Sequence, residues 1–174
     1  MTNRRLIITF QERKQRFAYM AGTGRRTSQA RIEAHARKVL AKMASTRLLN
    51  TLRISIILRK KVETMRNGNK ALGWSYPRDH AKGKTARAKH YPIKIDNTLP
   101  EREIMRVLRH ELMHVIQRAK GRLDYRAVKG QGVTYWRPAG HKGRSIAYPH
   151  DSTFPEWAER PWEVEAVRAE TLYI

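Results

Sequence analysis

The stretch "LRHELMHVIQ", residues 108–117, decides the expected fold because it sets two histidines four residues apart within an apolar helical pattern. Residues spaced by four lie on one face of a helix, so His110 and His114 can point their imidazoles at one ion. Glu111 follows the first histidine, beside the coordination position left open for water. Zinc lowers the pKa of bound water to about 7, and a nearby carboxylate can take its proton. The stretch therefore predicts a catalytic Zn²⁺ site with Glu111 as general base.

The helix around this motif is expected to span residues 99–120, with Gly121 as its C-cap. Its apolar residues gather on one side of a helical wheel: Ile104, Leu108, Leu112, Val115 and Ile116. The histidines lie on the opposite side, together with Val107 and Gln117. The helix is thus expected to bury one face and present the histidines on the other. The alternative is an ordinary surface helix whose outward face carries two histidines.

The chain before this helix alternates between β-prone and helical patterns. Strands are expected at residues 4–10, 52–60, 71–77 and 91–96, and a helix capped by Thr27 or Ser28 at residues 27–43. The strand at 52–60 alternates apolar and polar residues, as a half-buried strand does. Pro92 cannot donate to a β-ladder, which favours an edge position for the strand at 91–96.

The chain after this helix has two parts. Residues 121–155 are rich in glycine, proline and aromatic residues, and we expect a long irregular excursion over the surface. Tyr135 and Tyr148 within it are candidate oxyanion donors, although tyrosines in such loops also simply cover core. A helix is expected from near Pro161 to the end. Because no repeat or domain boundary is visible, residues 1–174 are predicted to form a single domain.

Composition narrows the function further. The chain has no cysteine, so a metal must be held by His, Asp or Glu. No apolar run approaches the ~20 residues that span a bilayer, and no signal peptide is visible. We therefore expect no membrane partner and a cytoplasmic location, in the host cytoplasm if the chain is phage-encoded.

Charge is the strongest global feature of the sequence: 37 Lys and Arg against 15 Asp and Glu leave a net charge of +22. Such a surface favours a polyanionic partner, and nucleic acid bound through non-specific electrostatics is the commonest one. The alternative is a generally cationic, solvated surface. The best candidates for phosphate contact are Arg25, Arg26, Lys60, Lys61, Lys82, Lys84, Arg87 and Lys89.

A catalytic zinc ion needs a third protein ligand. The metzincin extension is excluded because Gln117 and Lys120 stand where it requires glycine and histidine. Ligand-type residues remain further along the chain: His141, His150, Asp151, Glu156, Glu159, Glu163 and Glu165. Glu163 and Glu165 point about 200° apart on a helix, so only one of them can reach the metal.

Taken together, "HELMHV" and "RPWEVEAVRAE" resemble the gluzincin branch of zincin-like metallopeptidases, including compact regulators of the ImmA/IrrE kind. The resemblance implies Glu163 as third ligand and Ala166 as a small packing residue, while Glu165 stays the possible alternative ligand from its place on the same helix. Val167 departs from the pattern, which often has an aspartate there that supports a zinc-bound histidine. Glu170 could substitute in this role.

SprT-like proteases, small zincins that act on DNA-bound proteins, are a second comparison. Their usual third ligand is a histidine, which here would be His141 or His150.

The resemblance also implies the architecture: an α+β, compact zincin-like domain with a small mixed sheet, an active-site helix and a C-terminal helix carrying the third ligand. By this analogy residues 91–96 would be the edge strand that pairs with substrate. The implied function is a zinc-dependent metallopeptidase that hydrolyses a protein or peptide substrate, and the net charge leads us to expect that it acts near nucleic acid. The alternative is a basic nucleic-acid-binding or virion-associated protein that keeps the scaffold without turnover.

Overall fold

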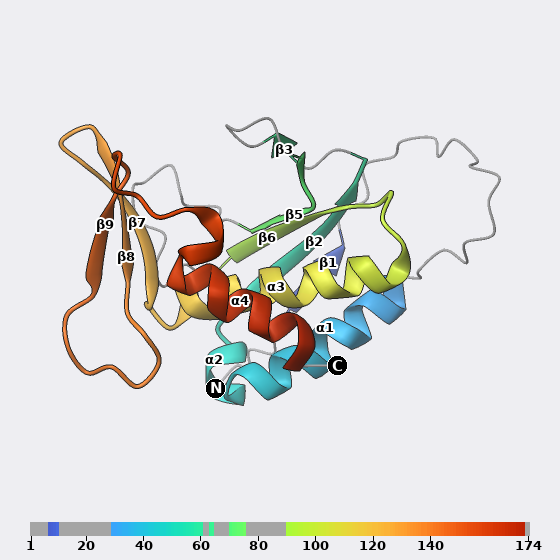
Figure 1. Ribbon diagram of the computed structural model, residues 1–174. Helices are drawn as coiled ribbons and strands as arrows, with labels where there is room; N and C mark the ends of the chain where they lie inside the picture. The colour runs from blue at the N-terminus through green and yellow to red at the C-terminus, as the bar shows by residue number, and fades with distance from the viewer. Residues whose placement is uncertain (1–6, 11–28, 61–62, 65–69, 76–89, 173–174) are drawn as a thin grey trace.

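The computed structural model describes residues 7–10, 29–60, 63–64, 70–75 and 90–172, and these form a mixed α/β arrangement compatible with an α+β class (Figure 1). The elements are β1 Ile7–Phe10, α1 Gln29–Met43, α2 Thr46–Leu49, β2 Arg53–Arg59, β3 Glu63–Thr64, β4 Lys70–Ala71, β5 Gly73–Ser75, β6 His90–Asp96, α3 Glu101–Ala119, β7 Leu123–Val128, β8 Gln131–Trp136, β9 Ile146–Pro149, the 3-10 turn η2 Trp157–Glu159 and α4 Pro161–Leu172. No helix within these residues is long and apolar enough to cross a membrane.

The main sheet has the strand order β1-β2-β6-β5, in which β1, β2 and β6 are parallel and β5 is antiparallel to β6. The prediction of an edge position for residues 91–96 is therefore wrong, because β6 lies inside the sheet. Pro92 is tolerated there because the three residues of β5 pair with Ile93, Lys94 and Ile95 and not with the proline. Among the described strands, β5 forms the edge on this side.

The expected alternation of strand 52–60 also needs correction. Ser55, one of the polar residues in this alternation, is buried along with Ile54 and Ile56, and β2 is flanked by a strand on each side. The Ser55 hydroxyl bonds Thr9 Oγ1 and His90 Nε2, both at 2.9 Å, which satisfies it without water. The strand predicted at 71–77 is divided by a bend at Leu72 between β4 and β5, and its last two residues lie outside the described part.

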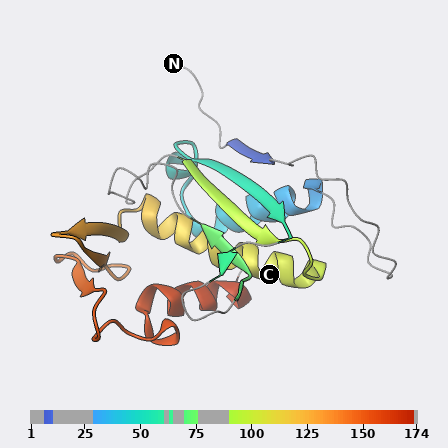
Figure 2. The ribbon, with the colours of Figure 1, turned by 90° about the horizontal axis from the view of Figure 1, so that it is seen from above.

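The core lies between the main sheet, α1 and α3, and α3 is in turn flanked by α4 (Figure 2). The predicted apolar side of α1 is confirmed: Ile32, Ala36, Val39, Leu40 and Met43 are all buried. The C-cap of α3 is Lys120, one residue before the predicted Gly121, which takes the next position in the left-handed conformation. Gly121 has φ +66°, and its N–H and that of Arg122 bond the carbonyls of Arg118 and Gln117, which closes the last turn.

The expected irregular excursion over 121–155 is wrong, because it contains the three-stranded antiparallel sheet β7-β8-β9 beside the main body (Figure 1). Lys129 and Gly130 join β7 to β8 with φ angles of 50° and 82°, which suits a tight hairpin turn. Leu123 and Trp136 are buried against Trp162 of α4, whereas much of the rest of this sheet is exposed. With so small a buried face, the sequence shows little apolar alternation. That all 174 residues form one domain stays a prediction.

Candidate metal site

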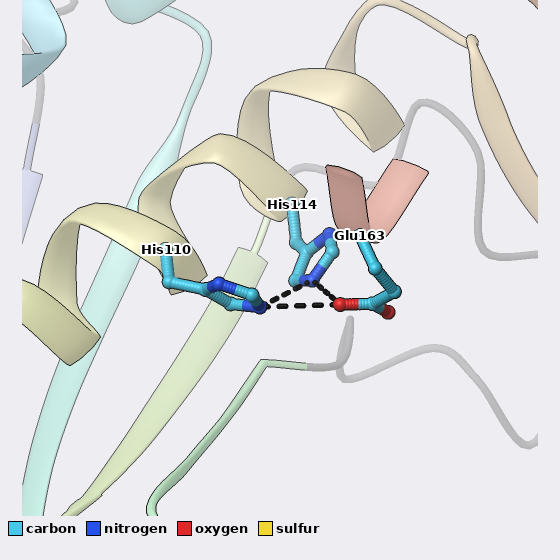
Figure 3. A group of neighbouring side chains, drawn as sticks. All are labelled: His110, His114 and Glu163. Atoms are coloured by element: carbon cyan, nitrogen blue, oxygen red, sulfur yellow. Dashed lines mark hydrogen bonds and ion pairs between the residues drawn. The ribbon is translucent and has the colours of Figure 1, made fainter. Parts of the chain in front are cut away.

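Two helices bring three potential ligand side chains together. His110 and His114 come from α3 and Glu163 from the first turn of α4, and all three are buried (Figure 3). The two Nε2 atoms are 3.1 Å apart, and Glu163 Oε2 lies 3.2 Å from His110 Nε2 and 3.1 Å from His114 Nε2. These atoms form a nearly equilateral triangle. A buried group of this kind could hold a metal ion.

The burial of this triangle differs from the expectation for α3. The sequence suggested that the histidines lie on an outward face, yet residues 107–118 of α3 are buried almost without a break. The histidine face is covered by α4, which packs along α3. The alternative of an ordinary exposed helix is therefore excluded by the structure.

His110 is held from behind by the carboxylate of Glu170, one of the side chains singled out from the sequence. Its Nδ1 lies 3.0 Å from Glu170 Oε1. The other oxygen of Glu170 accepts from Arg106 Nη1 at 2.5 Å, and Arg106 also pairs with Glu103. An ionised carboxylate only accepts hydrogen bonds, so His110 Nδ1 carries the proton. This arrangement leaves the Nε2 lone pair of a neutral His110 free within the triangle.

His114 has a different partner, which the sequence analysis did not assign. Its Nδ1 lies 2.8 Å from Oε1 of Gln117, a fully buried residue one turn further along α3. The sequence did place Gln117 on the histidine face, which was the only available signal. As with His110, an acceptor at Nδ1 leaves Nε2 of the neutral ring without a proton.

The positions of the imidazole protons around the triangle favour a bound cation. When both rings are neutral and protonated at Nδ1, two nitrogen lone pairs and a carboxylate oxygen face one another at 3.1–3.2 Å, and either a shared proton or a metal ion would relieve their repulsion. A tetrahedral zinc ion with bonds of about 2.0–2.1 Å would need ligand separations of about 3.3–3.4 Å, close to those observed. Two imidazoles and one carboxylate are a zinc donor set. The residues present thus fit the ion expected from the sequence.

The charges in the site are strongly coupled. Burial raises the pKa of Glu163, but the two histidines and their hydrogen bonds outweigh it and hold this pKa well below its usual range. Burial lowers the pKa of His110, yet its hydrogen bond to Glu163 and the charges of Glu111, Glu163 and Glu170 raise it overall. The histidines therefore favour the ionised form of Glu163. The site attracts positive charge, whether protons or a metal.

Glu111 lies beside the edge strand β5. It is buried, and its backbone carbonyl accepts a 3.4 Å hydrogen bond from the Ser75 hydroxyl. A Cβ atom added at Gly73 would come within 3.0 Å of both Cγ and Oε1 of Glu111 and 2.3 Å of Val107 Cγ1. Only glycine lets the strand pass this close to the carboxylate.

Gly73→Ala should therefore disturb both the fold and Glu111. We expect the free energy of unfolding to fall by about 1–3 kcal/mol, because the branched Val107 side chain has little freedom to give way. Denaturant titration measures this change. Gly143→Ala is the control, since its new methyl group would meet only the ring at the end of the exposed His141 side chain. Equal stability of the two variants would contradict the close approach of β5.

Trp157 is a second residue that the sequence analysis did not place in the site. Its ring stacks on the imidazole of His110, with ring centroids 5.9 Å apart and planes inclined by 15°. It is 41% exposed, so one part of the ring covers the ligand and another faces solvent. A tryptophan in an irregular stretch carries no spacing signal, which is why only the fold reveals this contact.

The other carboxylate of α4 considered as a ligand, Glu165, is turned away from the triangle. It forms a two-pronged ion pair with Arg122 at 2.9 and 2.7 Å and accepts from Gln117 Nε2 at 3.1 Å. The geometry therefore places Glu163, and not Glu165, with the histidines.

The remaining site candidates also lie apart from the triangle in their described contacts. Tyr148 packs edge-on against Trp162, and Tyr135 lies under the guanidinium of Arg126. His150 bonds Thr134 Oγ1 at 2.8 Å. His141 is exposed in the segment between β8 and β9. Neither histidine that a SprT-like site would use belongs to the cluster.

Most of the candidate phosphate contacts lie outside the described residues: Arg25, Arg26, Lys61, Lys82, Lys84, Arg87 and Lys89. Lys60 is exposed directly after β2. Their role stays a prediction.

Comparison of the chain with protein-family models, with curated proteins and with solved structures finds no match.

Proposed function

We propose that this protein is a zinc-dependent metallopeptidase that hydrolyses a protein substrate by activating water. The observation that carries the proposal is the convergence of three buried acceptor atoms, from His110, His114 and Glu163, whose geometry suits a tetrahedral cation. Glu111 adjoins the first ligand on the same helix and borders the edge strand. Ligands with an adjacent carboxylate base are what metal-assisted peptide hydrolysis requires.

The roles of the residues follow from their positions. His110, His114 and Glu163 would hold Zn²⁺, which when bound supplies Lewis acidity and lowers the pKa of water. The Glu111 carboxylate accepts a proton from the attacking water and delivers it to the leaving amine nitrogen. Glu170 keeps the proton of His110 on Nδ1. Tyr135 and Tyr148, the candidate oxyanion donors, are not assigned a role because their contacts lie elsewhere.

We further propose a zincin-like architecture in which substrate pairs with β5. This corrects the expectation for residues 91–96, since β6 is internal and β5 forms the edge next to Glu111. An extended peptide could add to this edge through backbone hydrogen bonds, which would bring its carbonyl groups near the triangle. The resemblance to gluzincins, with Glu163 as third ligand, also supports the zincin-like architecture.

The net charge of +22 supports a second element of the proposal, that the protein works near nucleic acid. The same observation favours the other candidate function, a nucleic-acid-binding or virion-associated protein without turnover. The two candidates share the metal site and the charge and differ in hydrolysis.

Zinc content and cleavage of a generic unfolded protein, measured on one preparation, test the proposal. A metallopeptidase should contain about one zinc per chain and cleave the substrate, with activity lost to a chelator and restored by Zn²⁺. Stoichiometric zinc without cleavage, together with nucleic-acid binding that weakens steeply with salt, would favour the binding protein. A chain that takes up no zinc would reject both versions of the metal site.

A further inference from the structure

Gln117 is the most completely enclosed polar side chain next to the metal-site triangle. It is 0% exposed and lies on α3, one turn after His114. Its Oε1 is 2.8 Å from His114 Nδ1, and its Nε2 donates to the Trp162 carbonyl at 3.0 Å and to Glu165 Oε2 at 3.1 Å. The amide oxygen and the NH₂ group of Gln117 are therefore both hydrogen-bonded, and the two bonds of the NH₂ group link α3 to α4.

The orientation of this amide follows from its partners. A backbone carbonyl and a carboxylate are acceptors only, so they require the NH₂ group of Gln117 to face them. The carbonyl oxygen must then face His114. Arg122, whose side chain is largely buried, donates to both oxygens of Glu165 and fixes the position of this carboxylate. The amide is thus held in one of its two possible orientations by groups that do not belong to the triangle.

We infer that Gln117 is a positioning residue that sets the tautomer of His114, acting as the inner member of the chain Arg122–Glu165–Gln117–His114. Its oxygen holds the His114 proton on Nδ1 and so leaves the Nε2 lone pair facing the position between Glu163 and His110 that a metal ion would take. The inference rests on the proposed metal site, and it assigns a task to residues that bind neither metal nor substrate.

The two histidines are supported by opposite chemistry. His110 is backed by a carboxylate, Glu170, whose second oxygen is neutralised by Arg106. A carboxylate in place of Gln117 would face two other acceptors, the Glu165 carboxylate and the Trp162 carbonyl. No hydrogen would lie between these groups, so their hydrogen bonds would be lost. An amide suits this position because it accepts on one side and donates on the other.

The test is Gln117→Met, which keeps the length of the side chain but removes the acceptor and the donors. Zinc affinity is measured by competition with a chromophoric chelator, and we expect a roughly 10- to 100-fold loss, as for other outer partners of metal-bound histidines. Gln29→Met, an exposed glutamine at the start of α1, is the matched control and should bind zinc as the parent does.

A spectroscopic readout separates tautomer control from a merely structural role. In zinc-loaded protein labelled with ¹⁵N-histidine, the parent should show a protected His114 Nδ1–H resonance, which Gln117→Met should lose while the His110 Nδ1–H, held by Glu170, persists. Should Gln117→Met not fold, Glu165→Ala decides. It should bind zinc more weakly than the parent, and its His114 Nδ1–H should exchange faster with solvent.

The outcomes distinguish this inference from the proposed function. A parent chain that takes up no zinc rejects the metal site and the inference with it. A parent that takes up zinc, combined with unchanged affinity and an unchanged His114 Nδ1–H signal in Gln117→Met, overturns the inference alone. If only Glu165→Ala folds, unchanged affinity and exchange in that variant overturn it equally.

Discussion

Glu111→Gln is expected to keep zinc bound and to lose hydrolysis by roughly 100- to 10,000-fold, the range that general acid–base groups contribute. The amide preserves the size of the side chain beside β5, where there is little room for another shape. It cannot accept the proton of the attacking water. Because Glu111 is not part of the ligand triangle, the metal should stay.

Zinc content and turnover of Glu111→Gln must be measured on the same preparation. Glu101→Gln is the matched control on the same helix, since it removes only an ion pair with the exposed Arg31, and such surface pairs contribute little. That control should be fully active. Turnover by Glu111→Gln at the parental rate would remove Glu111 from the mechanism, and loss of zinc from this variant would instead make it a ligand.

The second large effect is expected at Glu163. Glu163→Ala removes one of three converging ligand atoms and leaves the two histidines without their charge partner. Zinc affinity should fall by more than the roughly 10- to 100-fold typical of outer partners. Metal analysis after dialysis against a mild chelator measures the retention. Glu159→Ala, an exposed glutamate four residues earlier, should retain zinc fully.

Glu165→Ala provides the discriminating comparison, because Glu165 reaches the site only through Gln117. We expect it to weaken zinc binding by no more than about 10-fold, the lower bound for outer partners. The sequence left Glu165 as a possible alternative ligand, and its pairing with Arg122 and Gln117 instead makes it an outer partner of His114. If Glu165→Ala alone empties the site, the assignment of Glu163 is wrong.

Much of the architecture was predictable from local patterns. The helix around residues 108–117 and the apolar side of α1 follow from spacing along one segment, and the structure confirms them, while the helix cap lies one residue before the predicted glycine. The His110/His114 pair was predictable for the same reason, since residues four apart meet on any helix. The resemblance to gluzincins singled out Glu163 and Glu170, and the structure places both against the histidines.

Other features were misjudged because they depend on neighbours distant in the chain. Pro92 indicated an edge strand, but three residues of β5 cover the strand just beyond it. The sheet β7-β8-β9 buries so few side chains that its sequence looks like a loop. Ser55 appeared to face solvent until β1 and β6 enclosed it. In each case the burial of a side chain depended on neighbouring elements and could not be deduced from the local sequence.

By itself, the sequence determined which chemistry was available: two histidines on one helical face, a carboxylate beside them, no cysteine, and a strongly basic chain. Only the tertiary structure decided which carboxylate meets the histidines and how their protons are placed. Glu163 and Glu165 are two residues apart, and the packing of α4 on α3 turns one toward His114 and the other toward Gln117 and Arg122. Hydrogen bonds across this helix pair, which no local periodicity encodes, assign each side chain its role.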